Sequence, residues 1–276
     1  MHDRGGQGST NPSPTHSDRR IQMTRLKKIV TAACFIVLSA AAHADDLDKV
    51  KQTGRLTFAL TGKYPPFSFI DAAGQLQGFD VDIGSQIAKK IGVQAVPVTT
   101  AWDGIVGGLL AGKYHAIIGS MAITDERLRA VDFTQPYYRS GAQLFVPKGS
   151  GVEGIDQLNG KVLGVTLGET YEAWLRKNHP EVQIKTYKGL PDILIDLQNR
   201  RIDGFVTDKI AGILTIRDKQ INAKPVGALL YPEKIGIAVR KDSPRLREAI
   251  DAALGEIARD GAYGDMSRKW LGTDVR

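Results

Sequence analysis

The segment KYHAIIGS at residues 113–120 recurs in altered form as RIDGFVTD at residues 201–208. In both copies a basic residue precedes a short apolar run, which ends in a small polar or an acidic residue. The apolar runs predict buried strands, and the alignment places Ser120 and Asp208 at equivalent strand ends. The repeat therefore predicts that the chain builds the same kind of unit twice.

The sequence around each copy alternates between strand-like and helix-like spacing of apolar residues. The predicted strands are residues 56–60, 93–98, 115–120, 161–166, 182–187 and 202–207. The predicted helices are residues 80–91, capped by Asp80, and residues 103–111, 169–178, 191–200 and 209–217. Alternating strands and helices predict parallel sheets covered on both faces. We therefore predict an α/β protein with two similar lobes and mainly parallel sheets.

Two extended segments predict how the lobes are joined. Residues 141–147 follow the first lobe, and residues 235–240 follow the second. A helix is expected to begin at Ser243-Pro244, and residues 251–271 continue with helical spacing. The chain should thus leave lobe 1, build lobe 2 and return, which predicts a two-strand hinge beside a cleft. The expected division is residues 45–141 plus 238–276 for lobe 1 and residues 142–237 for lobe 2.

The N-terminal residues 1–44 have the composition of a leader. After Met23, basic residues precede an apolar run at residues 29–42, and Ala42-His43-Ala44 forms an A-x-A cleavage site. This is the order of a secretory signal peptide, so we expect translation from Met23, cleavage after Ala44 and a periplasmic location. Cys34 lies inside the apolar run, which argues against a lipid-attachment site.

Removal of the leader changes what the composition implies. Six of the 37 Lys and Arg residues and two of the 30 Asp and Glu residues lie in it, so 31 basic and 28 acidic residues remain. This small excess does not indicate a nucleic-acid surface. The mature chain has no cysteine, and its two histidines, His115 and His179, are too few for a histidine metal cluster. Residues 107–113 resemble a phosphate loop, but Tyr114 replaces the required Ser or Thr.

Candidate site residues follow from the ends of the predicted strands, because ligands of open α/β sheets bind there beside helix N-termini. Arg127 either grips a ligand carboxylate or is a solvated arginine paired with Asp125 or Glu126. Asp208 can bind a ligand ammonium, cap the helix that follows it, or do both. Two of the four aromatic residues in the strand-end segments are expected to wall a pocket: Tyr64, Phe67, Phe69 and Trp102.

Five ordered motifs carry a resemblance to a known family. They are Tyr64-Pro65-Pro66-Phe67, Gly78-Phe79-Asp80, Trp102-Asp103-Gly104, Ile123-Thr124-Asp125-Glu126-Arg127 and Asp132-Phe133-Thr134-Gln135-Pro136-Tyr137, followed by Gly160-Lys161 and Gly168. With them, residues 45–276 resemble the polar amino-acid-binding proteins of bacterial ABC importers, solute-binding protein family 3. Residues 168–175 and 269–275 are similar to its cystine-binding subgroup. The resemblance implies a bilobed periplasmic binding protein of type II that closes on one amino acid.

The resemblance also implies roles for individual residues. Arg127 matches the arginine that holds the ligand α-carboxylate, helped by the backbone at Thr170. Asp208 matches the acid that holds the α-ammonium. The strand-end pair and the aromatic wall beside the ligand match Ser120, Met121, Tyr64 and Trp102.

Three positions depart from the usual pattern of this family. Ala122 stands where a Thr or Ser hydroxyl normally helps to hold the α-ammonium. Thr61 stands where binders of basic amino acids often carry an acid, which argues against Lys or Arg as the ligand. Glu169 stands where Thr is usual beside the carboxylate site. Its side chain either points outward into solvent or points inward, and the inward orientation predicts a ligand with a second cationic or donor group.

The resemblance favours a transport receptor that makes and breaks no bond. It implies that the protein, as a monomer without metal or other cofactor, delivers a polar amino acid or close derivative to the membrane permease of an ABC importer. The alternative is an enzyme on the same scaffold, because the family also resembles periplasmic cyclohexadienyl dehydratases and Glu169 could supply an acid. Tyr171 occupies the place where the acid of those enzymes is expected, which favours the receptor.

Overall fold

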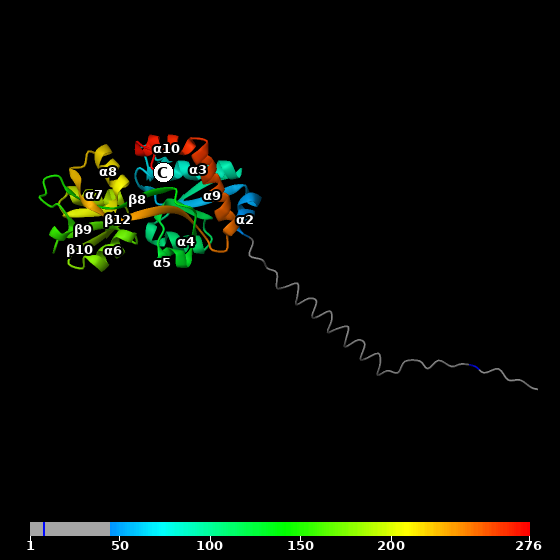
Figure 1. Ribbon diagram of the computed structural model, residues 1–276, viewed down its shortest axis with the longest axis horizontal. Coiled ribbons are helices and arrows are strands. Elements are labelled where there is room, and N and C mark those ends of the chain that lie inside the picture. The colour runs from blue at the N-terminus through cyan, green and yellow to red at the C-terminus, as the bar shows by residue number, and fades with distance from the viewer. Residues whose placement is uncertain (1–7, 9–44) are drawn as a thin grey trace, which may run out of the picture. The chain divides into compact units, whose positions relative to one another are not determined.

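Two sets of three parallel strands carry the fold, and two long strands join them. The first set consists of β5 (Gln94–Thr99), β1 (Arg55–Leu60) and β6 (Ala116–Ala122), and the second of β10 (Gln183–Tyr187), β9 (Val162–Thr166) and β11 (Gly204–Asp208). The antiparallel strands β8 (Tyr138–Pro147) and β12 (Ala223–Val239) complete the order β10-β9-β11-β8-β12-β6-β1-β5 (Figure 1). The predicted α/β class is confirmed, with one mixed sheet running through both halves.

The computed structural model describes Gly8 and residues 45–276. The predicted leader, Cys34 and the last leader residue, Ala44, lie outside the described residues. Residues 45–276 form one unit, and none of the helices in it combines the length and the apolar character that a bilayer crossing needs.

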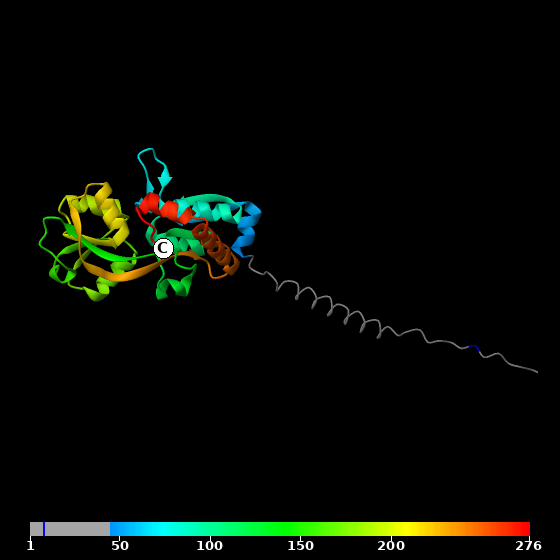
Figure 2. The same ribbon diagram turned by 45° about the horizontal axis from the view of Figure 1, so that its top comes forward.

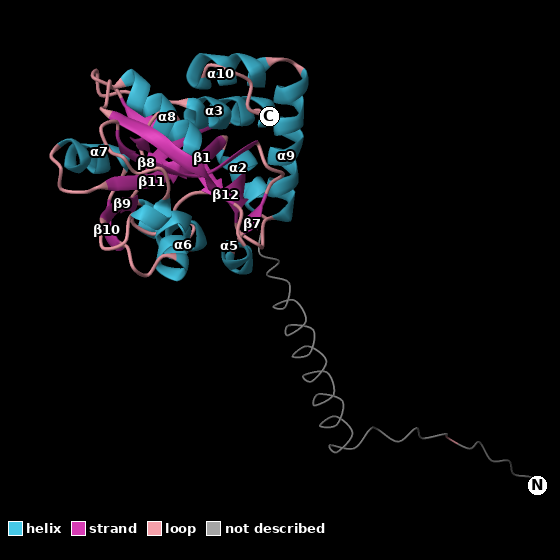
Figure 3. Ribbon diagram, turned by 60° about the vertical axis from the view of Figure 1, so that its left-hand side comes forward, coloured by secondary structure: helices cyan, strands magenta, loops and turns pink. Residues whose placement is uncertain are grey.

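Helices cover the sheet on both faces in each half (Figure 3). The first strand set carries α2 (Asp46–Thr53), α3 (Phe79–Ile91), α4 (Ile105–Leu110), α5 (Asp125–Ala130), α9 (Pro244–Arg259) and α10 (Ala262–Leu271). The second set carries α6 (Thr170–Asn178), α7 (Leu190–Gln198) and α8 (Lys209–Asp218). We call the two sets with these helices lobe 1 and lobe 2. A small sheet of β2 (Lys63–Tyr64), β3 (Ser68–Ile70) and β4 (Leu76–Gln77) projects from lobe 1 (Figure 2).

Each lobe seats one helix closely on its sheet through a glycine. In α3 the side chains of Ile83 and Ile87 are fully buried, and a Cβ at Gly84 would lie 2.4 Å from Cζ of the buried Phe58 in β1. In α8 a Cβ at Gly212 would lie 2.2 Å from Cζ of Phe145 in β8. Because glycine has no side chain, each of these helices can lie close to the strand beneath it.

The two long strands pass together between the lobes. β8 and β12 pair from Ile235↔Tyr138 to Tyr231↔Ala142, and again from Val226↔Leu144 to Ala223↔Pro147, with an irregular register between. The predicted extended segments 141–147 and 235–240 lie mostly in these strands. At Gly141 a Cβ would lie 2.5 Å from the carbonyl oxygen of Tyr231, so the two strands touch at this point.

The equivalence of the two repeated segments is incomplete. β11 ends at Asp208 as predicted, but β6 runs two residues beyond Ser120 because Met121 and Ala122 pair with β12. The pairing shifts register between Gly236 and Ala238, and Ser120 has φ of 56°. A left-handed backbone is costly for a residue with a side chain, so its surroundings must hold Ser120 in place.

Three predicted helices differ from the structure. Asp80 is not a cap: α3 begins at Phe79 with Gly78 in the capping position, where a Cβ would lie 2.2 Å from the Phe67 carbonyl oxygen. Residues 103–111 do not form one continuous α-helix. A short 3₁₀ helix, η1 (Trp102–Gly104), precedes α4, because three glycines in this stretch lower its helix propensity. Residues 251–271 belong to α9 and α10, which are separated at Gly261 with φ of 88°.

The first described residues are fixed to the other end of the chain. Asp45 caps α2 by accepting from the Leu47 N–H at 2.9 Å, and it also accepts from the N–H groups of Arg245 and Leu246 at 2.8 and 3.1 Å. Asp46 forms a buried ion pair with Arg240. Lobe 1 is thus assembled from both ends of the described chain.

Candidate functional site

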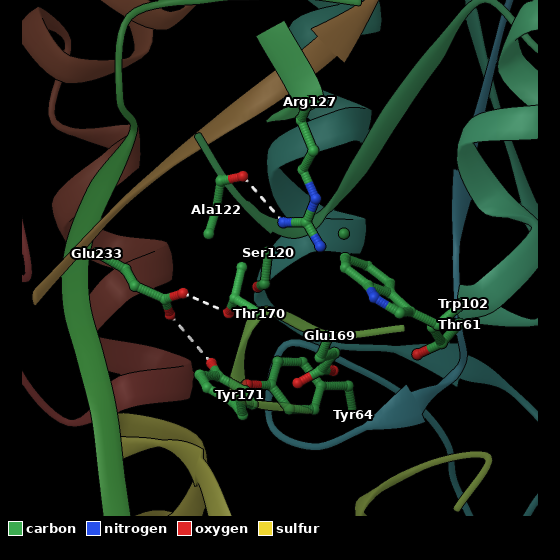
Figure 4. A pocket seen from close by; sticks show the side chains of 11 residues that line it. Thr61, Tyr64, Trp102, Ser120, Ala122, Arg127, Glu169, Thr170, Tyr171 and Glu233 are labelled. Carbon is green, nitrogen blue, oxygen red and sulfur yellow. Dashed lines mark hydrogen bonds between the residues drawn. The ribbon is translucent and has the colours of Figure 1, made fainter. Parts of the chain in front are cut away.

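A cavity lies between the lobes, beyond the ends of the parallel strands. Figure 4 shows the side chains that converge on it, which come from lobe 1, from the start of α6 in lobe 2 and from β12. The lining residues are Thr61, Tyr64, Trp102, Gly119, Ser120, Ala122, Arg127, Glu169, Thr170, Tyr171 and Glu233. Eight of the ten predicted site residues are therefore brought together.

Arg127 supplies the positive charge of the cavity. The Thr124 hydroxyl caps α5 by accepting from the Arg127 N–H at 3.2 Å, which fixes where this residue enters the helix. The guanidinium donates to the Ala122 carbonyl at 2.9 Å and lies over the Trp102 ring, 5.5 Å from its centroid. It forms no ion pair with any described acid, so the alternative pairing with Asp125 or Glu126 is absent there. Burial lowers its pKa, against the opposing effect of Glu169.

Two of the four predicted aromatic residues line the cavity. Trp102 and Tyr64 do so, whereas Phe67 is fully buried in the core and Phe69 packs edge-on against Trp270. The indole N–H of Trp102 donates across the cleft to the Gly168 carbonyl at 3.3 Å. Gly168 has φ of 80°, and this left-handed turn allows the lobe 2 backbone to approach lobe 1.

Ser120 is held by a buried acid that the prediction treated as a helix cap. Asp80 is fully buried and accepts from the Ser120 hydroxyl at 2.8 Å and from the Tyr137 hydroxyl at 2.6 Å. The Tyr137 oxygen in turn accepts from the Ser120 N–H at 3.1 Å. Burial raises the pKa of Asp80 to about 7, although both hydrogen bonds lower it. This network stabilises the left-handed backbone of Ser120 beside the cavity.

Asp208 is buried and is not one of the residues that line the cavity. One carboxylate oxygen caps α8 by accepting from the N–H groups of Ile210 and Ala211 at 2.8 and 3.0 Å, so the capping role is confirmed. The other oxygen, Oδ2, is buried and has no hydrogen-bond partner among residues 45–276. Burial raises the pKa of Asp208 to about 6, and the Ser140 hydroxyl lowers it, although the Ser140 oxygen also forms no hydrogen bond among the described residues. A free acceptor therefore remains for a ligand group that reaches past the wall.

Glu169 lines the cavity, as the inward alternative predicted, and not the outer surface. It occupies the capping position of α6, but its carboxylate accepts no hydrogen bond from that helix. No described cation forms an ion pair with it. Burial and then the charge of Glu233 raise its pKa to about 8, while Arg127 and the Thr166 hydroxyl lower it.

Glu233 is a cavity residue that the sequence did not reveal. Its two carboxylate oxygens accept from the Thr170 hydroxyl at 2.6 Å and from the Tyr171 hydroxyl at 3.1 Å. Burial raises its pKa, and these two hydrogen bonds lower it. Glu233 lies in β12, two residues before the predicted extended segment 235–240, and belongs to no motif, so the sequence offered no signal for it.

Met121 does not contact the cavity and corrects the predicted strand-end pair. Its side chain is fully buried in the core of lobe 1, because successive residues of β6 point to opposite faces. Ala122 and Thr61 do line the cavity, and neither carries charge. In the described part of the chain, no group of three or more His, Cys, Asp or Glu has an arrangement that could hold a metal ion.

Sequence comparison identifies known proteins that this chain resembles. The model of the bacterial extracellular solute-binding proteins, family 3, matches residues 56–273. The L-cystine-binding protein TcyJ of Escherichia coli K12 is 36% identical over 254 residues, which cover 91% of this chain and 96% of that protein.

Solved structures of similar proteins agree in fold. A mutant of ArgBP from T. maritima is 31% identical with a TM-score of 0.78, covering 82% of this chain and 99% of that one. The ancestral amino-acid-binding protein AncCDT-1, described as a precursor of cyclohexadienyl dehydratase, has the same identity, TM-score and coverage.

Proposed function

Because the chain belongs to the bacterial extracellular solute-binding proteins, family 3, we propose that it is an extracytoplasmic receptor for a polar amino acid or close derivative. It binds this ligand in the cavity between the lobes and delivers it to the permease of an ABC importer. The relatives reported above are named for cystine, arginine and amino-acid binding, so an enzyme on this scaffold is not favoured.

The unpaired guanidinium of Arg127 is the observation that carries this proposal. It lies half-buried in the cavity with one N–H on the Ala122 carbonyl and no described carboxylate in ion-pair contact. A guanidinium presents several donors in one plane, which suits a carboxylate held by two parallel hydrogen bonds. A ligand α-carboxylate therefore pairs with Arg127, assisted by the backbone at Thr170.

The remaining groups suit the other end of an amino acid. We assign the ligand α-ammonium to the free Oδ2 of Asp208, helped by Ser120. Because Ala122 has no hydroxyl, the ligand α-ammonium lacks one neutral acceptor. This lowers the binding free energy by about 0.5 to 1.5 kcal/mol and does not abolish binding. Tyr64 and Trp102 provide the walls against which the aliphatic part of the ligand packs.

Export of the protein fits the start of the described unit. Cleavage after Ala44 would make Asp45 the first residue, and Asp45 caps α2 with its side chain. The intact mass of protein recovered from the periplasm tests this site, because a retained leader or a lipid on Cys34 would change that mass and contradict the assignment.

Calorimetry on two variants of the same helix tests the receptor. First, a thermal-shift screen over amino acids, cystine and opines identifies the tightest ligand. Arg127→Ala should then weaken that ligand by about 2 to 5 kcal/mol, because its carboxylate loses its partner. The control is Arg129→Ala, which removes an exposed arginine of α5 and should leave the affinity unchanged. Wild-type affinity in a folded Arg127→Ala protein would overturn the assigned site.

A further inference from the structure

We propose that the ligand carries a second cationic group, and that Glu169 receives it. This inference rests on the proposed function, since it names the class of amino acid that the cavity accepts. It begins from the balance of charges in the cavity lining, which holds one guanidinium, that of Arg127, and two carboxyl groups, those of Glu169 and Glu233. The buried carboxyl group of Asp208 lies outside this lining.

The three acids differ in what already satisfies them. Glu233 accepts one hydrogen bond on each oxygen, from Thr170 and Tyr171. Asp208 is half satisfied, because one oxygen caps α8 and the other is free. Glu169 takes no part in capping its own helix, and within residues 45–276 no cation pairs with it. Among the described residues, neither Asp208 nor Glu169 thus has a cationic partner.

A singly charged amino acid leaves one of these acids unpaired. Its carboxylate pairs with Arg127 and its α-ammonium with Asp208, which leaves Glu169 in a closed cleft without a counter-ion. An unpaired buried carboxylate is costly and takes up a proton instead. In agreement, burial and the neighbouring Glu233 raise the pKa of Glu169 to about 8. A second ammonium or guanidinium on the ligand replaces that proton and pairs with Glu169.

The position of Glu169 also explains how a neutral residue can stand at position 61. Thr61 lines the cavity from lobe 1, and its hydroxyl accepts from the Lys63 N–H at 3.2 Å. Glu169 lines the same cavity from lobe 2. With this assignment the site offers a carboxylate to a basic group although Thr61 is neutral.

Two classes of amino acid carry a second cationic group, and matched pairs of ligands distinguish them. Dibasic amino acids bring a terminal cation alone, whereas a disulfide-linked bis-amino acid such as cystine brings an ammonium with a second carboxylate. L-arginine is compared with L-citrulline, its uncharged analogue. L-cystine is compared with the mixed disulfide of cysteine and 3-mercaptopropionate, which lacks the second ammonium. In the pair that contains the natural class, the cationic member should bind at least tenfold more tightly.

Glu169→Gln provides the decisive test. By calorimetry, its affinity for the cationic member should fall at least tenfold while that for the uncharged member is unchanged or rises. Glu153→Gln, which changes an exposed glutamate outside the cavity, should alter neither. Thermal unfolding checks that the variants fold, and Glu169→Asp should retain part of the preference if the charge is what matters.

The outcomes separate this inference from the proposed function. Three results would overturn the second cation while Arg127→Ala still weakens binding. In Glu169→Gln they are an equal loss of affinity for both members of the pair, or no loss for either. In the wild-type protein it is tighter binding of uncharged amino acids. Wild-type affinity in Arg127→Ala, or no binding of any amino acid, would overturn the receptor itself.

Discussion

Asp80 is a fully buried carboxyl group with two hydroxyl donors and no ion-pair partner within residues 45–276, and this makes stability depend on pH. Its folded pKa of about 7 lies above the ordinary value of 3.8, so the folded protein holds a proton that the unfolded chain releases. The stability from this group is therefore present at low pH and is lost as pH rises toward and through 7. Asp208 and Glu169, with pKa values near 6 and 8, act in the same direction.

We expect Asp80→Asn to flatten this dependence. Between pH 5 and pH 7, the ionisation of Asp80 should lower the free energy of unfolding of the ligand-free wild-type protein by about 2 kcal/mol. The variant should lose correspondingly less over the same range. Melting temperatures measured at pH 5, 6, 7 and 8 test this, with the exposed Asp156→Asn as a control that keeps the wild-type slope. Parallel curves for wild type and Asp80→Asn would show that Asp80 does not titrate in this range.

Site residues could be predicted where a local pattern fixed them. Arg127 follows a Thr cap at fixed spacing, and Asp208 precedes a helix at a strand end, so the sequence placed both near the cleft. Glu233 could not be found, because its partners Thr170 and Tyr171 are more than sixty positions away in the chain. Met121 was misassigned because a one-residue step along a strand changes the face of the sheet.

The closest helix-to-sheet contacts of both lobes depend on glycine, and α3 allows a direct test. Gly84→Ala gains helix propensity but places a methyl group against the buried Phe58 ring. Overpacking of this kind costs about 1 to 3 kcal/mol, which exceeds the gain. The matched control is Gly107→Ala in α4, where a Cβ meets nothing within 4 Å. That change should stabilise by about 0.5 to 1 kcal/mol.

Urea unfolding of both variants measures these two effects with opposite signs. If Gly84→Ala were as stable as the wild-type protein, the Phe58 ring would have room to move, and the close contact would not set the position of α3.

Elements were predictable where apolar periodicity was strong and ends were marked. α3 shows isoleucines every four residues and ends before Gly92, and it was found within one residue. α2 was missed because its mean character is polar and it has only Val50 as a fully buried apolar anchor. The β2–β4 sheet was missed because its strands are two or three residues long, too short for an alternation to show.

The whole molecule should respond to ligand by closing around β8 and β12. We propose the division into residues 45–141 plus 238–276 and residues 142–237, with these two strands as the connection. A ligand that touches both lobes stabilises the closed state by the difference between its affinities for closed and open forms. X-ray scattering should show a smaller radius of gyration with saturating amounts of the ligand found by screening. Arg127→Ala at the same ligand concentration should stay open, and an unchanged wild-type radius would contradict a hinge.

The contacts between Asp45 and the start of α9 have a consequence for the order of folding. These hydrogen bonds join residues that are 200 and 201 positions apart, so the pairing is among the most distant in the described part of the chain. A polypeptide that emerges from a channel with its N-terminus first holds β1 and α3 long before α9 arrives. Lobe 2, contained in one continuous stretch, can become native while lobe 1 still waits for its last helices. We therefore expect lobe 1 to be completed last, because contacts between residues so far apart in the sequence form late.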